Sequence, residues 1–105
     1  MSSVSINGKE YPLRVSLNAI EAIQDRYGNM TAMGEHLGKP SELKFILATL
    51  VNEGMKYAAS ENMTTVKLLS EDYLGVVLDY KALSDGNFAQ AIVDAFNEST
   101  GAEKN

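Results

Sequence analysis

The stretch Ser41–Ala59 reads SELKFILATLVNEGMKYAA, and its pattern predicts one long helix. At about 100° per residue, its polar side chains gather on one side. Its apolar side chains spread over more than half of the remaining circumference: Leu43, Ile46, Leu47, Leu50, Val51, Gly54, Met55 and Ala58. Because a surface helix shows a narrower apolar stripe, we expect this helix to be contacted from several directions at the centre of the fold. Phe45 projects near the polar side, where it is either covered by a neighbouring element or left exposed as a contact point.

A β-hairpin is predicted before this helix, over residues 3–15. Asn7-Gly8 lies between two alternating runs, and this dipeptide favours a two-residue turn with positive φ at both positions. Such a turn pairs Ile6 with Lys9, and it places the apolar residues of the hairpin on one face: Val4, Ile6, Tyr11, Leu13 and Val15. Pro12 has no N–H and is therefore expected at an edge. Since a lone hairpin is marginal in water, its apolar face is expected to lie on the helices.

Local patterns divide the rest of the chain into shorter helices. Ser16 is a suitable N-cap for a helix over residues 17–27 that Gly28 ends, with a buried stripe of Leu17, Ile20, Ile23 and Tyr27. A short helix is expected over residues 30–37, a helical turn at Val66, Leu68 and Leu69, and a helix from Glu71 to about Tyr80 capped by Ser70. A turn over residues 83–87, with Ser84 or Asp85 as cap, precedes a last helix over residues 88–98. The inward residues expected in these segments are Met33, Leu37, Leu74, Val77, Leu78, Phe88, Ile92, Ala95 and Phe96.

The predicted fold class is therefore α+β and mostly α, with an N-terminal β-hairpin followed by about five helices packed around a central long helix. We expect one domain over residues 1–100, in which residues 16–99 form the helical part. Residues 101–105 are expected to form a flexible tail.

Composition and charge exclude several classes of function. Nine Lys and Arg stand against fourteen Asp and Glu, and this net charge of −5 argues against binding to nucleic acid or to an anionic membrane surface. The absence of cysteine excludes disulfides, thiolate metal sites and cysteine nucleophiles. No segment approaches the run of about 20 apolar residues that spans a bilayer, and the first five residues do not resemble a signal peptide. We expect a soluble intracellular protein.

Catalytic groups are scarce in this sequence. His36 is the only histidine, and it is expected to be a surface or helix-end residue rather than an acid–base group. Glu71 and Asp72 are adjacent acids that suit the start of a helix. No glycine cluster follows a predicted strand, and no Gly-x-Ser-x-Gly motif is present. We therefore expect no catalytic, cofactor-binding or metal-binding residues, and a protein that is not an enzyme.

Large apolar side chains exceed what a core of this size buries easily. The chain contains five methionines, five tyrosines and three phenylalanines. The residues that are hardest to bury together are Phe45, Tyr57, Met63, Tyr73 and Tyr80. Met and Tyr suit adaptable contact surfaces, so these five residues are predicted to form a surface that binds a helix of a partner, with ordinary partial burial as the alternative.

The opening of the chain resembles the tail assembly chaperones of long-tailed bacteriophages and prophages. The resemblance lies in the hairpin VSINGKEYPL (residues 4–13), the helix SLNAIEAI (residues 16–23) and the stop Arg26-Tyr27-Gly28. It continues more loosely as a long apolar helix, a polar linker and two further helices.

This resemblance implies a chaperone that binds the long helical tape-measure protein in the host cytoplasm, helps recruit tail-tube subunits, and is absent from the mature virion. A frameshifted longer form of the chain is another implied partner. A second copy of the chain is a further candidate, because a hairpin edge can pair between chains. The alternatives are a structural tail or head–tail connector subunit retained in the virion, and a small enzyme or regulator from a mobile element.

Overall fold

A two-stranded hairpin and five α-helices make up the fold in the computed structural model, which describes residues 2–29, 31–84 and 87–100. The elements are β1 (Ser3–Ile6), β2 (Lys9–Pro12), α1 (Leu17–Tyr27), the 3-10 helix η1 (Thr31–His36), α2 (Pro40–Asn62), α3 (Glu71–Val77), α4 (Tyr80–Ser84) and α5 (Asn87–Thr100). The predicted α+β, mostly α fold class is confirmed.

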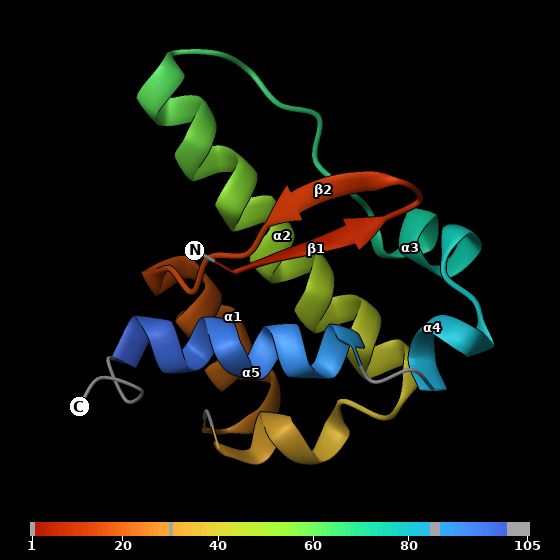
Figure 1. Ribbon diagram of the computed structural model, residues 1–105. Helices are drawn as coiled ribbons and strands as arrows, with labels where there is room; N and C mark the ends of the chain where they lie inside the picture. Colours follow the sequence, from red (N-terminus) through yellow and green to blue (C-terminus); the bar gives the residue numbers. More distant parts are fainter. Residues whose placement is uncertain (1, 30, 85–86, 101–105) are drawn as a thin grey trace.

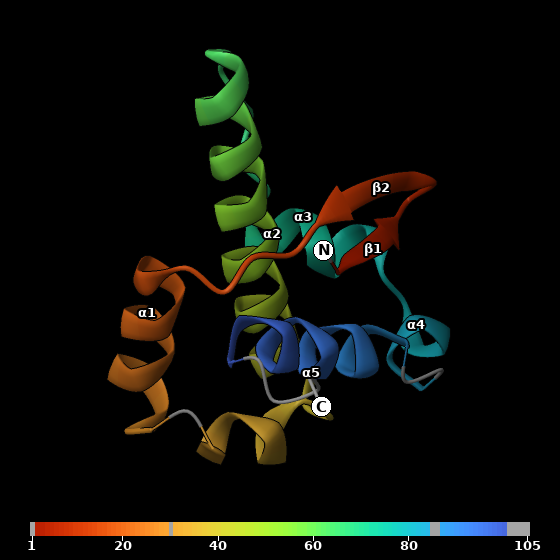
Figure 2. The same cartoon turned by 60° about the vertical axis from the view of Figure 1, so that its left-hand side comes forward.

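The long helix α2 lies at the centre, as its broad apolar surface predicted. It contacts β2, α1, α3 and α5, and Figures 1 and 2 show these elements arranged around its first half while its last turns project from the body. Its fully buried side chains include Ile46, Leu47 and Leu50. Pro40 occupies the first turn, where its missing N–H has no cost. The helix continues three residues beyond the predicted Ala59, to Asn62, and its C-cap Met63 takes the left-handed conformation.

The hairpin has the predicted turn and register. Asn7 and Gly8 have positive φ angles, and Val4 pairs with Tyr11 while Ile6 pairs with Lys9. The second strand is shorter than predicted, because β2 ends at Pro12. Beyond it the backbone turns to α2, where the N–H of Arg14 donates to the carbonyl of Leu50 at 3.2 Å.

Helix α1 has its predicted bounds, but Leu17 is not part of its buried stripe. Ser16 caps the helix, since its Oγ accepts a hydrogen bond from the N–H of Ala19. Ala19 and Ile23 are buried, whereas 83% of Leu17 is exposed. At about 100° per residue, Leu17 lies about 120° around the helix from Ile23 and so faces solvent.

The segment between α1 and α2 is a 3-10 helix rather than an α-helix. Asn29 Oδ1 accepts a hydrogen bond from the N–H of Ala32 and caps η1. Met33 and Leu37 are buried, as predicted. Met30, the predicted first residue of this helix, lies outside the described residues.

The segment after α2 departs most from expectation. The predicted helical turn at Val66, Leu68 and Leu69 is wrong, because residues 64–70 contain no regular element. Helix α3 begins after the Ser70 cap as predicted, but it ends at Val77 instead of Tyr80. Leu78 is the C-cap of α3 and has an extended conformation, and Asp79 then accepts a hydrogen bond from the N–H of Ala82 at the start of α4.

Helix α5, the last helix of the chain, packs against β1 of the hairpin and against α2. It begins one residue before and ends two residues after its predicted bounds. Phe88, Ile92 and Ala95 are buried and Phe96 is half-buried, as predicted. The predicted turn over residues 83–87 is partly wrong, because α4 includes Leu83 and Ser84. The predicted cap Asp85 and the predicted tail over residues 101–105 lie outside the described residues.

Candidate partner-binding surface

The five residues predicted to contact a partner do not form one surface. Met63 and Tyr80 are 92% and 80% exposed, while Tyr57 and Tyr73 are each 36% exposed and Phe45 is half-buried. They belong to α2, its C-cap, α3 and α4. Each side chain therefore has to be assessed from its own surroundings.

Two of the four aromatic rings among these five residues lie against arginines of the same chain. The guanidinium of Arg26 lies 4.3 Å from the ring centre of Phe45, and that of Arg14 lies 3.7 Å from the ring centre of Tyr57. These are cation–π distances. Phe45 is thus covered by a neighbouring element, which was one of the two possibilities left open by the sequence.

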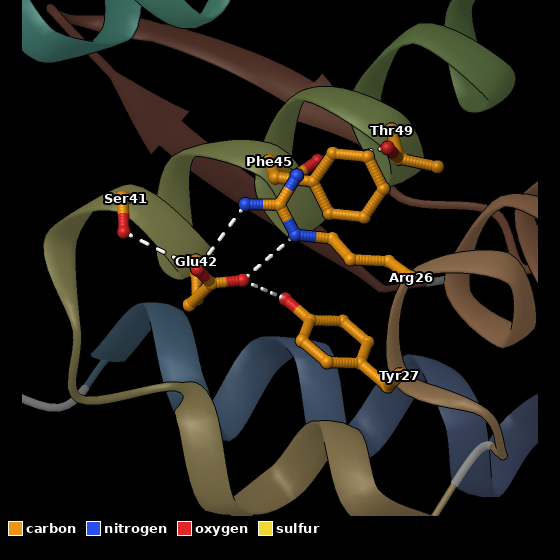
Figure 3. Close-up of polar contacts among 6 residues, drawn as sticks. All are labelled: Arg26, Tyr27, Ser41, Glu42, Phe45 and Thr49. Carbon is orange, nitrogen blue, oxygen red and sulfur yellow. Dashed lines mark hydrogen bonds and ion pairs between the residues drawn. The ribbon is translucent and has the colours of Figure 1, made fainter.

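Arg26 also belongs to a polar cluster that joins α1 to α2 (Figure 3). Its Nε lies 2.8 Å and its Nη2 lies 3.1 Å from the two carboxylate oxygens of Glu42. The hydroxyl of Tyr27 donates to Glu42 Oε1 at 2.6 Å, and that of Ser41 donates to Oε2 at 3.3 Å. His36 stacks on Tyr27 with ring centres 4.9 Å apart. The cluster therefore holds three elements together by bidentate and stacked contacts.

The cluster shifts the proton affinities of its members. Hydrogen bonds from Arg26 and then from Tyr27 lower the pKa of Glu42 from 4.5 to about 2. Burial, followed by the hydrogen bond to Glu42, raises the pKa of Tyr27 from 10.0 to about 12. Glu42 is consequently ionised and Tyr27 is neutral at physiological pH. This arrangement suits a structural tie, because the Glu42 carboxylate accepts hydrogen bonds from three side chains of the same chain.

A groove lies between β2, α2 and the segment that returns to α3, and we call it the α2–β2 groove. Its volume is about 660 Å³, and it is lined by Lys9, Tyr11, Met55, Thr65, Val66, Lys67, Leu68, Leu69, Ser70 and Tyr73. Tyr11 is buried and forms part of the floor, whereas Val66 and Leu68 are 38% and 45% exposed. Of the five predicted contact residues, Tyr73 lines this groove, and Met63 ends α2 two residues before its wall begins at Thr65.

The wall of the α2–β2 groove is held at both ends. At its start the N–H of Thr64 donates to the carbonyl of Ala59 at 3.0 Å. At its far end the side-chain amide of Asn52 bonds both the N–H and the carbonyl of Leu69, each at 2.8 Å. Ser70 then caps α3 by accepting from the N–H of Tyr73 at 3.0 Å. The wall is therefore a segment without regular secondary structure that long-range and capping hydrogen bonds hold in place.

Two smaller hollows flank α4. Tyr80 lines one of about 320 Å³ together with Leu43 and Lys44 of α2 and Leu74 of α3. The other, of about 440 Å³, lies beside Ser3 and Ser5 of β1 and is floored by Phe88 of α5. Tyr80 is thus separated from the α2–β2 groove, and the helix α3 lies between the two sites.

Sequence reasoning missed several residues of the α2–β2 groove. The sequence predicts Lys9 and Tyr11 only as hairpin residues, Met55 only as part of the central helix, and Val66 and Leu68 in a helical turn. One signal was available, since three apolar residues, Val66, Leu68 and Leu69, directly follow residues 60–65, which are polar except for Met63. The pairing of Asn52 with Leu69 had no signal in the sequence, because the two residues are 17 positions apart.

No metal site or membrane span emerges within residues 2–29, 31–84 and 87–100. No group of three or more His, Cys, Asp or Glu side chains could hold a metal ion there, and no helix combines the length and apolarity needed to cross a bilayer. Comparison of the chain with family models, curated proteins and solved structures found no match.

Proposed function

We propose that this protein is a phage tail assembly chaperone that binds the tape-measure protein. The observation that carries the proposal is the exposed apolar wall of the α2–β2 groove, formed by Val66, Leu68 and Tyr73. Apolar grooves of this kind accept the apolar face of a partner helix. The proposal is also supported by the resemblance of residues 4–28 to this family.

The second candidate function is a structural tail or head–tail connector subunit. It is favoured by β1, whose outer edge borders the hollow beside α5 and carries neither proline nor charge at Ser3 and Ser5. An edge without such protection can pair with a strand of another subunit. Mass spectrometry of purified virions separates the two functions, because a chaperone is expected to be absent and a structural subunit abundant.

Co-expression with the tape-measure protein of the same phage or prophage tests the first candidate. We expect the tape-measure protein to become more soluble and to elute with this chain in gel filtration. Leu68→Ser is expected to weaken that complex, and Leu17→Ser is the matched control because Leu17 is an exposed leucine on α1, outside the groove. Unchanged solubility of the tape-measure protein, together with no co-eluting complex, would overturn the proposal.

A further inference from the structure

We infer that the α2–β2 groove binds an amphipathic helix whose apolar stripe is bordered by acidic side chains. The inference deepens the proposed function by naming the site and the chemistry of the partner segment, and it rests on that function only for the identity of the partner. It is carried by the charge of the groove and by the exposure of its wall.

The charge of the groove is opposite to the charge of the chain. The chain has a net charge of −5, but the charged side chains that line the groove are two lysines, Lys9 and Lys67, and no carboxylate lines it. Lys9 belongs to β2 and Lys67 to the returning segment, so the two cations approach from different walls. Glu10, the acidic neighbour of Lys9, bonds to Ser3 on β1 instead.

Neither lysine has a carboxylate partner among the described residues. The ion pairs of that part of the chain are Arg26–Glu42 and Glu53–Lys56. Lys9 has its ammonium 5.6 Å from the ring centre of Tyr11, at the floor of the groove. Two cations without carboxylate partners beside apolar surface favour a partner that brings acidic residues next to an apolar stripe.

The apolar part of the groove suits side chains rather than a partner backbone. Met55 and Leu69 are half-buried, while Val66, Leu68 and Tyr73 are the exposed apolar side chains of the wall. At the edge of β2 beside α2, the carbonyl of Pro12 faces Gly54 and the N–H of Arg14 bonds to Leu50. These contacts occupy part of the edge that a partner strand would use. A helix that inserts its apolar face is therefore the occupant that the groove fits best.

The wall is also arranged before any partner binds. Asn52 fixes the backbone of Leu69, and Thr64 bonds to the end of α2. A wall that is already ordered loses less conformational freedom on binding. The groove is thus built by the fold of the free chain rather than created by a partner.

Two synthetic helical peptides of equal length test the inference. Both carry the same leucine stripe, and the residues that border the stripe are glutamates in one peptide and lysines in the other. Binding to the full chain is followed by fluorescence anisotropy at low and high salt. We expect the acidic peptide to bind about five- to tenfold more tightly at low salt, which is the reverse of what the net charge of the chain alone would produce.

Variants locate the binding and separate charge from apolar contact. The double variant Lys9→Glu, Lys67→Glu is expected to reverse the preference between the peptides. Lys39→Glu is the control, because Lys39 is exposed at the start of α2, about 24 Å along the helix from Met55. Leu68→Ser is expected to weaken both peptides by a similar factor, whereas Leu17→Ser leaves both unchanged.

The inference is overturned if both peptides bind equally, if the basic peptide binds more tightly, or if the double variant keeps the preference of the parent chain. If the chain forms a dimer that neither peptide dissociates, the groove binds a second copy of the chain. That result would also overturn the inference. Failure of the proposed function looks different, since the peptides would still discriminate but no complex with the tape-measure protein would form. If the groove variants still form the complex with the tape-measure protein, the inference is wrong but the proposed function is not contradicted.

Discussion

The substitution Gly54→Ala places a methyl group at the point where the hairpin touches α2. Gly54 is buried in the middle of the helix. A Cβ atom added there would lie 2.4 Å from the carbonyl oxygen and 2.8 Å from the carbonyl carbon of Pro12. Both atoms belong to the backbone, so the clash cannot be relieved by rotating a side chain. The hairpin or the helix has to move.

The size of the effect follows from two opposing terms. Inserting a methyl group into a packed site costs about 1–3 kcal/mol, and a backbone contact this close places Gly54→Ala in the upper part of that range. Alanine in place of a helical glycine restores about 1 kcal/mol of stability. We therefore expect the free energy of unfolding to fall by about 1–2 kcal/mol. The corresponding fall in Tm is about 4–16 °C for a chain of this size.

Urea denaturation followed by circular dichroism measures this change, and Gly75→Ala is the matched control. A Cβ atom on Gly75 would lie 3.3 Å from Cδ and Nζ of Lys44, the mobile end of a long side chain, so little resists it. Gly75 is exposed on α3, and its replacement is expected to stabilise the chain by up to about 1 kcal/mol. Equal stabilisation by both substitutions would refute the close approach of the hairpin to α2.

Three further predictions concern the polar groups of the fold. The free energy of unfolding is expected to fall as the pH drops from about 4.5 to about 2. Glu42 has a pKa of about 2 in the folded chain and 4.5 in its ordinary state. The unfolded chain therefore binds more protons than the folded chain in this pH range, which favours unfolding. Urea melts across this range measure the slope, which Glu42→Gln should reduce. Asn52→Ala removes both hydrogen bonds to Leu69, so we expect a loss of about 1–3 kcal/mol and faster proteolysis within residues 64–70, read by mass spectrometry. Ser70→Ala removes the cap of α3 and is expected to cost about 1 kcal/mol in thermal unfolding, while Ser70→Asp retains most of the stability.

Each of these expectations has a contrary outcome. An unchanged pH slope in Glu42→Gln would mean that the carboxylate does not couple folding to protonation. Cleavage of Asn52→Ala at the rate of the parent chain would mean that the amide does not hold the groove wall. Equal thermal stability of Ser70→Ala and the parent chain would mean that the Ser70 side chain does not stabilise α3.

The elements whose bounds were predicted well are those that are defined by near neighbours. The turn at Asn7-Gly8 depends on two residues that tolerate positive φ. Ser16 and Ser70 cap α1 and α3 by bonding to N–H groups three positions ahead. Contacts over such short separations are visible in the sequence, because the residues that make them are a few positions apart.

The errors fall where a distant contact competes with a local pattern. Val66, Leu68 and Leu69 have the composition of a helical turn, but the side chain of Asn52 bonds both backbone groups of Leu69, and residues 64–70 contain no regular element. A distant contact also decides the surroundings of Phe45 and Tyr57, because Arg26 and Arg14 lie over their rings. Arginines that lie 19 and 43 positions away in sequence give no local indication of such contacts.

The sequence by itself determined the fold class, the hairpin register and the central place of α2, because hydrophobic periodicity and turn residues act over a few positions. Only the tertiary structure decided which apolar side chains stay exposed and that Lys9 and Lys67 line one groove. The physical reason is that a groove is a relation between segments. Its walls come from β2, α2 and residues 65–70, and those segments meet only after the whole chain has packed around α2.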